Sequence, residues 1–176
     1  MMQYVITVDT SDRETGIMEK IKAHELGVLH RAFSVFIFNS RNQMLLQQRA
    51  HEKYHGGGLW TNTCCSHPLP GENVQQGADR RLAEEMGMAC RLRPEFSFIY
   101  KARVENGLTE HELDHVFIGY SDQDPVPDAA EVRDWKWVDM EWLLEDVSQR
   151  PELYTVWFKI MLPRLLPVAG IQVLDA

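Results

Sequence analysis

Apolar and polar positions in the first part of the chain follow the patterns of β-strands. Residues Gln3–Asp9 alternate between the two classes, which predicts a first strand, and a polar turn follows that ends near Gly16. Residues Ala32–Phe38, AFSVFIF, form a continuous apolar run that predicts a buried strand. Turn-forming residues follow at Asn39–Gln43, and the segment MLLQQR returns from them. We therefore expect these last two strands to form a hairpin.

Residues 73–88 carry the periodicity of a helix. Four apolar residues recur at every fourth position and share one helical face: Val74, Ala78, Leu82 and Met86. Asn73 is a helix-capping residue with Gln76 three positions later, and Gly87 is suited to the end of the helix. Opposite charges lie four residues apart in two pairs, Arg80/Glu84 and Arg81/Glu85. The pattern predicts one amphipathic helix.

The rest of the chain predicts further strands and two closing helices. Strands are expected on either side of the turn Glu105–Gly107 and once more before the helices, at Ser97–Val104, Thr109–Tyr120 and Asp134–Val138. The helices are expected at Met140–Gln149 and Pro151–Leu162, because Pro151 suits a first helical turn and Pro163 would terminate or kink the second helix. We therefore expect a single domain over residues 1–176, with an α+β fold or an α/β/α sandwich of mixed sheets.

Composition narrows the possible classes of protein. The net charge of −8 and the pI near 5.3 argue against a nucleic-acid binder. No apolar run reaches the ~18 residues of a membrane span, and the start of the chain lacks the pattern of a signal peptide. The three cysteines, Cys64, Cys65 and Cys90, do not resemble a secreted disulfide framework. We expect free thiols in a cytoplasmic protein.

Two short segments carry the residues with the most evident chemistry. Residues two apart in an extended chain face the same way, so Cys65 and His67 would share a face and Cys64 would point to the other. The same rule sorts TEHELDHVF into an acidic face of Glu110, Glu112 and Asp114 and an opposite face of His111 and His115. Taken singly, a histidine is usually a hydrogen-bonded surface residue and an acidic strand face is usually solvated. Cys64 and Cys90 are expected to be small buried hydrophobes.

Taken together, these segments and the upstream HELGVLH indicate a metal site. Three histidines, His24, His30 and His67, with paired carboxylates suit Zn²⁺, Mn²⁺, Fe²⁺ or Co²⁺. The chain has no CxxC pair, which argues against a zinc finger. The spacing in the sequence does not itself establish that these segments meet in space.

Within this predicted helix, the segment RRLAEEMGM, Arg80 to Met88, resembles the core of the Nudix box, a motif of metal-bound diphosphate chemistry. The matching residues are Glu72, Arg80, Glu84, Glu85 and Gly87. Ser66 stands where the box has its leading glycine, and Arg81 stands where it has a glutamate. The arginine removes a carboxylate that would bind metal, which argues against ordinary Nudix hydrolysis. Without the resemblance, Glu84 and Glu85 would be interpreted as a solvated helix face.

Several further motifs resemble one family within the Nudix superfold. In order they are EKIKAH, HRAFSVFIFN, QQRA, LWTNTCCSHPLPGE, the altered box and TEHELDHVF, with a looser match at LYTVWFKIML. They cover most of the chain and resemble the type I isopentenyl-diphosphate Δ-isomerases. The resemblance implies a Nudix-like α/β/α sandwich with mixed β-sheets. It also implies a reaction that moves a carbon–carbon double bond between isopentenyl and dimethylallyl diphosphate.

The same resemblance implies roles for individual residues. Cys65 would be the catalytic thiol and Glu112 the second acid–base group, and Tyr100 and Trp157 fall at the aromatic positions. Mn²⁺ or Zn²⁺ would be held by His24, His30, His67, Glu110 and Glu112, and Mg²⁺ by Glu85 with the substrate diphosphate. The phosphate-binding cations would be Lys20, Arg49, Lys53 and Arg81. The partner is then a small prenyl diphosphate, with no nucleic acid and no membrane, and the protein would act as a monomer or weak dimer.

Three alternatives remain open at the level of the sequence. A Nudix diphosphohydrolase would share the helix, although Arg81 argues against it and Cys65 would be unexplained. A non-catalytic protein on the same fold would bind metal and diphosphate without turnover. A structural zinc protein would unfold when its metal is removed.

Overall fold

The computed structural model describes residues 3–167, in which nine strands form one hydrogen-bonded network. The strands are β1 Tyr4–Val8, β2 Glu14–Glu19, β3 His30–Phe38, β4 Met44–Arg49, β5 Trp60–Thr61, β6 Cys64–Ser66, β7 Arg93–Arg103, β8 Thr109–Tyr120 and β9 Val132–Val138. The α-helices are α1 Lys20–Leu26, α2 Val74–Met86, α3 Met140–Gln149 and α4 Val156–Leu165, with short 3₁₀ turns at Glu105–Gly107 and Pro151–Leu153. None of the helices in this part of the chain is long and apolar enough to cross a bilayer.

Strand β3 is the centre of the network because both of its edges are paired. One edge runs parallel to β8, from the pair His30/Glu112 to the pair Phe38/Tyr120, and the other is antiparallel to β6. Strand β4 meets β3 only at Phe38/Met44 and then pairs along its length with β9. The predicted hairpin is present, with its turn at residues 39–43, but its two strands pair only next to that turn. The partners β6 and β8 already occupy the edges that β4 would need.

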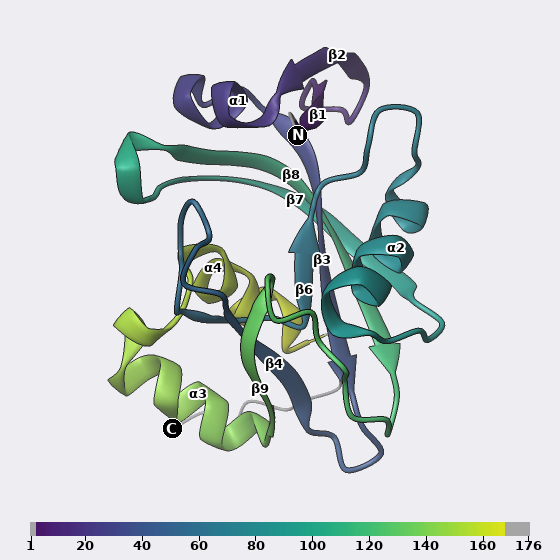
Figure 1. The fold of residues 1–176 in the computed structure, drawn as a ribbon, viewed down its shortest axis with the longest axis vertical. Helices are drawn as coiled ribbons and strands as arrows, with labels where there is room; N and C mark the ends of the chain where they lie inside the picture. The colour runs from purple at the N-terminus through teal and green to yellow at the C-terminus, as the bar shows by residue number, and fades with distance from the viewer. Residues whose placement is uncertain (1–2, 168–176) are drawn as a thin grey trace.

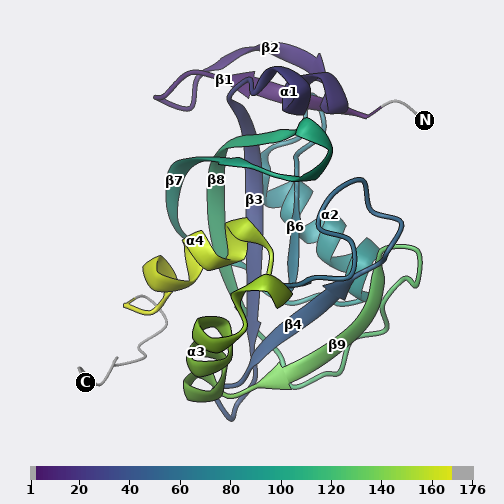
Figure 2. The same cartoon turned by 90° about the vertical axis from the view of Figure 1, so that its left-hand side faces the viewer.

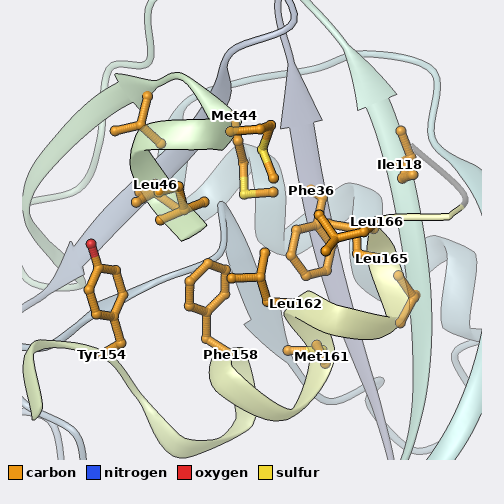
Figure 3. Packing of buried hydrophobic residues seen from close by; sticks show 14 of the residues in the cluster. Phe36, Met44, Leu46, Ile118, Tyr154, Phe158, Met161, Leu162, Leu165 and Leu166 are labelled. Carbon is orange, nitrogen blue, oxygen red and sulfur yellow. The ribbon is translucent and has the colours of Figure 1, made fainter. Parts of the chain in front are cut away.

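The apolar faces of β3 alternate between two cores, and helices cover both. Phe33, Val35 and Ile37 pack against α2, whereas Phe36 and Phe38 belong to the core that also holds α3 and α4. Figures 1 and 2 show α2 on one side of the central strands and α3 and α4 on the other, and Figure 3 shows side chains of α4 packed around Phe36. The α+β fold with helices on both sides of mixed sheets is therefore confirmed.

Helix α2 has the ends that its sequence predicts. The side chain of Asn73 accepts a hydrogen bond from the Gln76 backbone, and the Gln76 side chain accepts one from the Asn73 backbone. Gly87 ends the helix in the left-handed region at φ 62°, where a Cβ atom would lie 2.3 Å from the Val126 carbonyl oxygen. The four apolar residues of the predicted face lie toward the core, and Ala78, Leu82 and Met86 are fully buried.

Two segments differ from the predicted elements. Strand β2 was not predicted: it begins at Glu14, inside the predicted polar turn, and runs past Gly16 to Glu19. It pairs with β1 and none of its residues is fully buried, so it lacks apolar alternation. The predicted helix Pro151–Leu162 is interrupted, because Tyr154 bridges to Trp60 and the Thr155 amide donates to the Trp60 carbonyl. The helix proper begins at Val156 and continues past the exposed Pro163 to Leu165, so the prediction of its end was also wrong. Helix α1 was not predicted.

Candidate active site

A pocket of about 310 Å³ collects residues from segments that are far apart in the chain. Of the thirteen residues to which the family resemblance gives a role in the site, eleven line the pocket: Lys20, Arg49, Lys53, Cys65, His67, Arg81, Glu85, Tyr100, Glu110, Glu112 and Trp157. The other two, His24 and His30, are fully buried and reach the pocket residues Glu110 and His67. The structure therefore brings the whole predicted set together at one place.

The two adjacent cysteines lie on opposite faces of β6. Pairing of Cys64 with Val35 and of Cys65 with Ser34 fixes the register of this short strand beside β3. Cys64 is fully buried in the core under α2, and Cys65 lines the pocket. Both are free thiols. Burial raises the pKa of the Cys65 thiol to about 12, although the nearby Arg49 guanidinium opposes the shift, so the thiol holds its proton at neutral pH.

Strand β8 presents its acidic residues on one buried face. Glu110, Glu112 and Asp114 are all buried. On the other face, His111 contacts the Gly27 carbonyl and His115 contacts Asp12. Burial alone would raise the pKa of Glu112, but contacts with His30 and His67 hold the pKa well below its ordinary value. The Glu112 carboxylate is therefore ionised beside the protonated thiol.

Three histidine side chains converge on these carboxylates through their Nε2 atoms. His67 Nε2 lies 2.8 Å from Glu112 Oε1 and 3.2 Å from His30 Nε2. His24 Nε2 lies 3.3 Å from Glu110 Oε2. The Nδ1 atoms of His24 and His30 lie 2.7 and 2.8 Å from the backbone carbonyls of residues 20 and 28. A carbonyl only accepts, so each Nδ1 carries a hydrogen, and Nε2 is the ring atom directed at the cluster and able to bind a metal ion.

This cluster fits a divalent metal ion. One ligand atom from each of His24, His30, His67 and Glu112 lies within 4.8 Å of the others. Among the described residues, neither His24 Nε2 nor Glu110 Oε2 has a hydrogen-bond partner, although both atoms are buried. Metal-bound histidines commonly donate their second ring N–H to a backbone carbonyl, as His24 and His30 do. The donor set of imidazole and carboxylate suits Zn²⁺, Mn²⁺, Fe²⁺ or Co²⁺.

Basic residues gather in another part of the pocket. Burial, together with the positive charges of Lys53, Arg49 and Arg81, lowers the pKa of Lys20 to about 8. The pKa of Lys53 is likewise lowered by burial and by Arg49 and Arg81. Such cations repel one another, so their grouping in a pocket favours binding of a multiply charged anion. Arg49 Nε is buried and has no hydrogen-bond partner within residues 3–167.

Acidic residues of α2 and of the loop before β9 complete this part of the pocket. Glu85 is buried, accepts a 3.0 Å hydrogen bond from Gln47 Nε2 and is paired with Arg81. Burial opposes ionisation of Glu85, but Arg81 and Lys53 lower its pKa overall. Arg81 also lies 3.2 Å from Glu131, which pairs with Lys53. The arginine at the altered position of the box thus contacts carboxylates on two segments.

Two aromatic residues of the pocket are fixed by hydrogen bonds. The Tyr100 hydroxyl donates to Glu112 Oε2 at 2.6 Å. The Trp157 indole N–H donates to Thr61 Oγ1 at 3.0 Å, and the Arg49 guanidinium lies over the Trp157 ring at 5.1 Å. Both side chains are buried, so burial and these hydrogen bonds hold their rings in fixed positions beside the pocket.

Sequence analysis did not find the loop residues Tyr54 and His55. Both line the pocket, and His55 Nε2 lies 2.6 Å from Glu110 Oε1. The loop between β4 and β5 has no periodicity, and its glycines Gly56 and Gly58 adopt positive φ. The only signal in the sequence is a histidine two residues after Lys53, in the stretch HEKYHGGG.

Comparison with known proteins gives consistent matches. Residues 28–158 match the NUDIX domain family. The chain is 52% identical to the isopentenyl-diphosphate Delta-isomerase of Burkholderia multivorans, over 99% of this chain and 97% of that protein. It is 51% identical to isopentenyl-diphosphate Delta-isomerase 1 of Aromatoleum aromaticum, over 94% of each.

Solved structures show the same fold at low sequence identity. A protein from Deinococcus radiodurans superposes with a TM-score of 0.77 at 18% identity, covering 92% of this chain and 98% of that one. A MutT protein from Methanosarcina mazei superposes with a TM-score of 0.64 at 20% identity, covering 80% of this chain and 94% of that one. These two likenesses concern the fold.

Proposed function

The chain belongs to the type I isopentenyl-diphosphate Δ-isomerases of the NUDIX superfamily, and from this premise we propose how its pocket performs the reaction. The enzyme interconverts isopentenyl and dimethylallyl diphosphate in isoprenoid biosynthesis. The reaction requires addition of a proton to an unactivated alkene and removal of a proton from the neighbouring carbon. One observation carries the mechanism: the Cys65 thiol and the Glu112 carboxylate line the same pocket as a group of cations.

The basic residues anchor the diphosphate. Lys20, Arg49, Lys53 and Arg81 supply positive charge in a protein whose net charge is −8. Charge-assisted hydrogen bonds to phosphate oxygens are stronger than neutral ones. The pKa values of Lys20 and Lys53 are lowered mainly by burial and further by repulsion from neighbouring cations. Binding of the anion relieves that repulsion. The hydrocarbon end of the substrate then extends toward Cys65 and Glu112.

Cys65 and Glu112 perform the two proton transfers. They stand on β6 and β8, which flank β3 on its opposite edges, so they can approach a flat substrate from two sides. In the direction of dimethylallyl diphosphate, the Cys65 thiol gives its proton to the terminal alkene carbon, and the Glu112 carboxylate takes a proton from the carbon next to the double bond. In the reverse direction the two groups exchange roles. The Tyr100 hydroxyl holds the second oxygen of Glu112.

The intermediate resembles a tertiary carbocation, which needs stabilisation and protection from water. The face of an aromatic ring stabilises a cation by about 0.5–2 kcal/mol, and buried Trp157 is placed for this role. Its indole is held by Thr61 and cannot turn away without losing that hydrogen bond. Burial of the reacting side chains keeps out water that would add to the cation.

The residues of the site would hold two metal ions. His24, His30, His67, Glu110 and Glu112 would hold Mn²⁺ or Zn²⁺, and Glu85 with the diphosphate would hold Mg²⁺. When bound, the cations supply positive charge that neutralises phosphate and tunes the pKa of neighbouring groups. The cytoplasmic location, the single domain and the monomer or weak dimer remain predictions from the sequence.

The reaction is tested with isopentenyl diphosphate in D₂O, in the presence of Mg²⁺ and Mn²⁺, followed by proton and phosphorus NMR in one tube. We expect dimethylallyl diphosphate with deuterium in its methyl groups and an unchanged diphosphate signal. Release of monophosphate and inorganic phosphate would instead identify a diphosphohydrolase. Unchanged spectra with metal bound would identify a non-catalytic binding protein.

Removal of metal is expected to abolish turnover without unfolding the chain. The two cores of the fold lie on either side of the central strands and are built from apolar residues outside the His/Glu cluster. Circular dichroism after chelation should therefore show native secondary structure. Adding Mn²⁺ should restore turnover and raise the melting temperature, since a ligand at ~100 times its Kd stabilises the folded state by about 2.7 kcal/mol. Unfolding on chelation would support the structural-zinc alternative, and full activity without metal would contradict the metal site.

A further inference from the structure

The loop between β4 and β5 places one more histidine against the proposed metal cluster. His55 is 5% exposed, and its Nε2 lies 2.6 Å from Glu110 Oε1. We propose that His55 is a positioning residue that orients the Glu110 carboxylate toward the metal. The inference rests on the metal site proposed above and adds a residue that the sequence motifs do not include.

The two oxygens of Glu110 are divided between two histidines. Oε1 faces His55, and Oε2 lies 3.3 Å from His24 Nε2. The spacing of Oε2 and Nε2 is close to the ~3 Å expected between adjacent ligand atoms that each lie about 2.1 Å from one ion. Among the described residues neither Oε2 nor His55 Nε2 has a hydrogen bond of good geometry, so Oε1 meets His55 as a close ion-pair contact. His55 thus stands against one oxygen, and the other faces His24 and the proposed ion.

The His55 ring is held in place from several directions. The Tyr54 ring meets it edge-on at 4.2 Å, and the Trp157 ring meets it edge-on at 5.3 Å. The His55 carbonyl accepts a hydrogen bond from Arg49 Nη2 at 3.1 Å. The next residue, Gly56, has a φ of 60°, and a Cβ atom there would lie 3.1 Å from Trp157. A ring confined in this way can hold a carboxylate in one orientation.

A role as a positioning residue fits better than a second metal ion. His24 belongs both to the group with His30, His67 and Glu112 and to the group with His55 and Glu110. Its Nδ1 is bound to the Lys20 carbonyl, so only Nε2 can bind a metal, and one lone pair serves one ion. The two groups therefore share a single ion. Carboxylates that bind metal are commonly held by an outer partner, and loss of that partner typically weakens metal binding about 10–100-fold.

The test measures Mn²⁺ affinity by calorimetry on the full chain without substrate, for wild type, His55→Ala, His55→Gln and His51→Ala. We expect His55→Ala to weaken binding about 10–100-fold. His55→Gln keeps a side-chain N–H for Glu110 and should recover most of the affinity. His51 lies on the same loop, is exposed and does not line the pocket, so His51→Ala should bind as wild type does.

A second measurement separates positioning from direct ligation. X-ray absorption of the Zn²⁺-loaded protein should show three imidazole ligands in wild type and also in His55→Ala. Four imidazoles in wild type would overturn the proposal in favour of a direct ligand. Equal Mn²⁺ affinity in wild type and His55→Ala would overturn the proposed role of His55 but would leave the metal site in place. Absence of Mn²⁺ binding in wild type would overturn the metal site itself.

Discussion

Replacement of Cys65 by alanine is expected to reduce kcat by a factor of at least about 10²–10⁴, because it removes one of the two proton-transfer groups. The thiol lines the pocket and, as a partly buried side chain, packs only against the edge of the core that holds α3 and α4. The melting temperature should therefore stay close to that of wild type. Turnover would be measured by NMR with saturating Mg²⁺ and Mn²⁺, and stability by thermal denaturation. Wild-type turnover in Cys65→Ala would remove the thiol from the mechanism.

Cys64→Ala is the matched control, and we expect it to lower stability while leaving turnover unchanged, the reverse of Cys65→Ala. Cys64 is fully buried against α2 and has no access to the pocket. Loss of its sulfur leaves a small cavity, which is expected to lower the free energy of unfolding by about 1 kcal/mol. Turnover should stay near the wild-type value. An equal loss of turnover in both variants would contradict the assignment of the two sulfurs.

Glu112→Gln is expected to be as severe as Cys65→Ala, since the amide keeps the shape of the side chain but cannot accept a proton. The expected loss in kcat is again about 10²–10⁴-fold. Metal affinity should also fall, because the neutral amide replaces a carboxylate that lies 2.8 Å from His67 Nε2. Turnover at saturating Mn²⁺ separates the two effects, since only the loss of proton transfer persists when the site is filled. Wild-type rates under those conditions would exclude the acid–base role.

Asp114→Asn is the matched control on the same face of β8. Asp114 is buried, accepts a 2.9 Å hydrogen bond from Ser34 and does not line the pocket. Burial and the neighbouring Glu112 raise the pKa of Asp114 well above its ordinary value, which favours the neutral form that the amide resembles. The substitution should therefore change kcat far less than Glu112→Gln does. A comparable loss would mean that the whole acidic face, rather than Glu112, controls the reaction.

Local periodicity predicted the parts of the site that depend on one element. The division of β8 into an acidic face and a histidine face follows from the alternation of side chains along a strand. The ends of α2 follow from Asn73 and Gly87. The opposite orientations of Cys64 and Cys65 follow from the same alternation in β6. In each case the residues that decide the geometry are neighbours in the sequence.

The features that the sequence did not predict depend on contacts between distant segments. The pairing of β3 with β8 brings His30 beside Glu112, and neither segment carries a signal for that register. The break before α4 arises because Tyr154 pairs with Trp60, on a strand almost a hundred residues earlier. His55 reaches Glu110 from a loop that has no pattern of its own. The family resemblance, rather than periodicity, grouped His30 with Glu112, and it pointed neither to His55 nor to the contact of Tyr154 with Trp60.

The loop between β4 and β5 supports two ligands at once. It carries Lys53 among the cations proposed to hold the diphosphate, and two residues later it carries His55 against Glu110 of the proposed metal cluster. Any shift of this segment therefore changes the binding of both ligands. Thermodynamic linkage requires the effect to be mutual: the factor by which bound metal tightens diphosphate binding equals the factor by which diphosphate tightens metal binding. Titration of either ligand in the presence and absence of the other would measure one and the same coupling free energy.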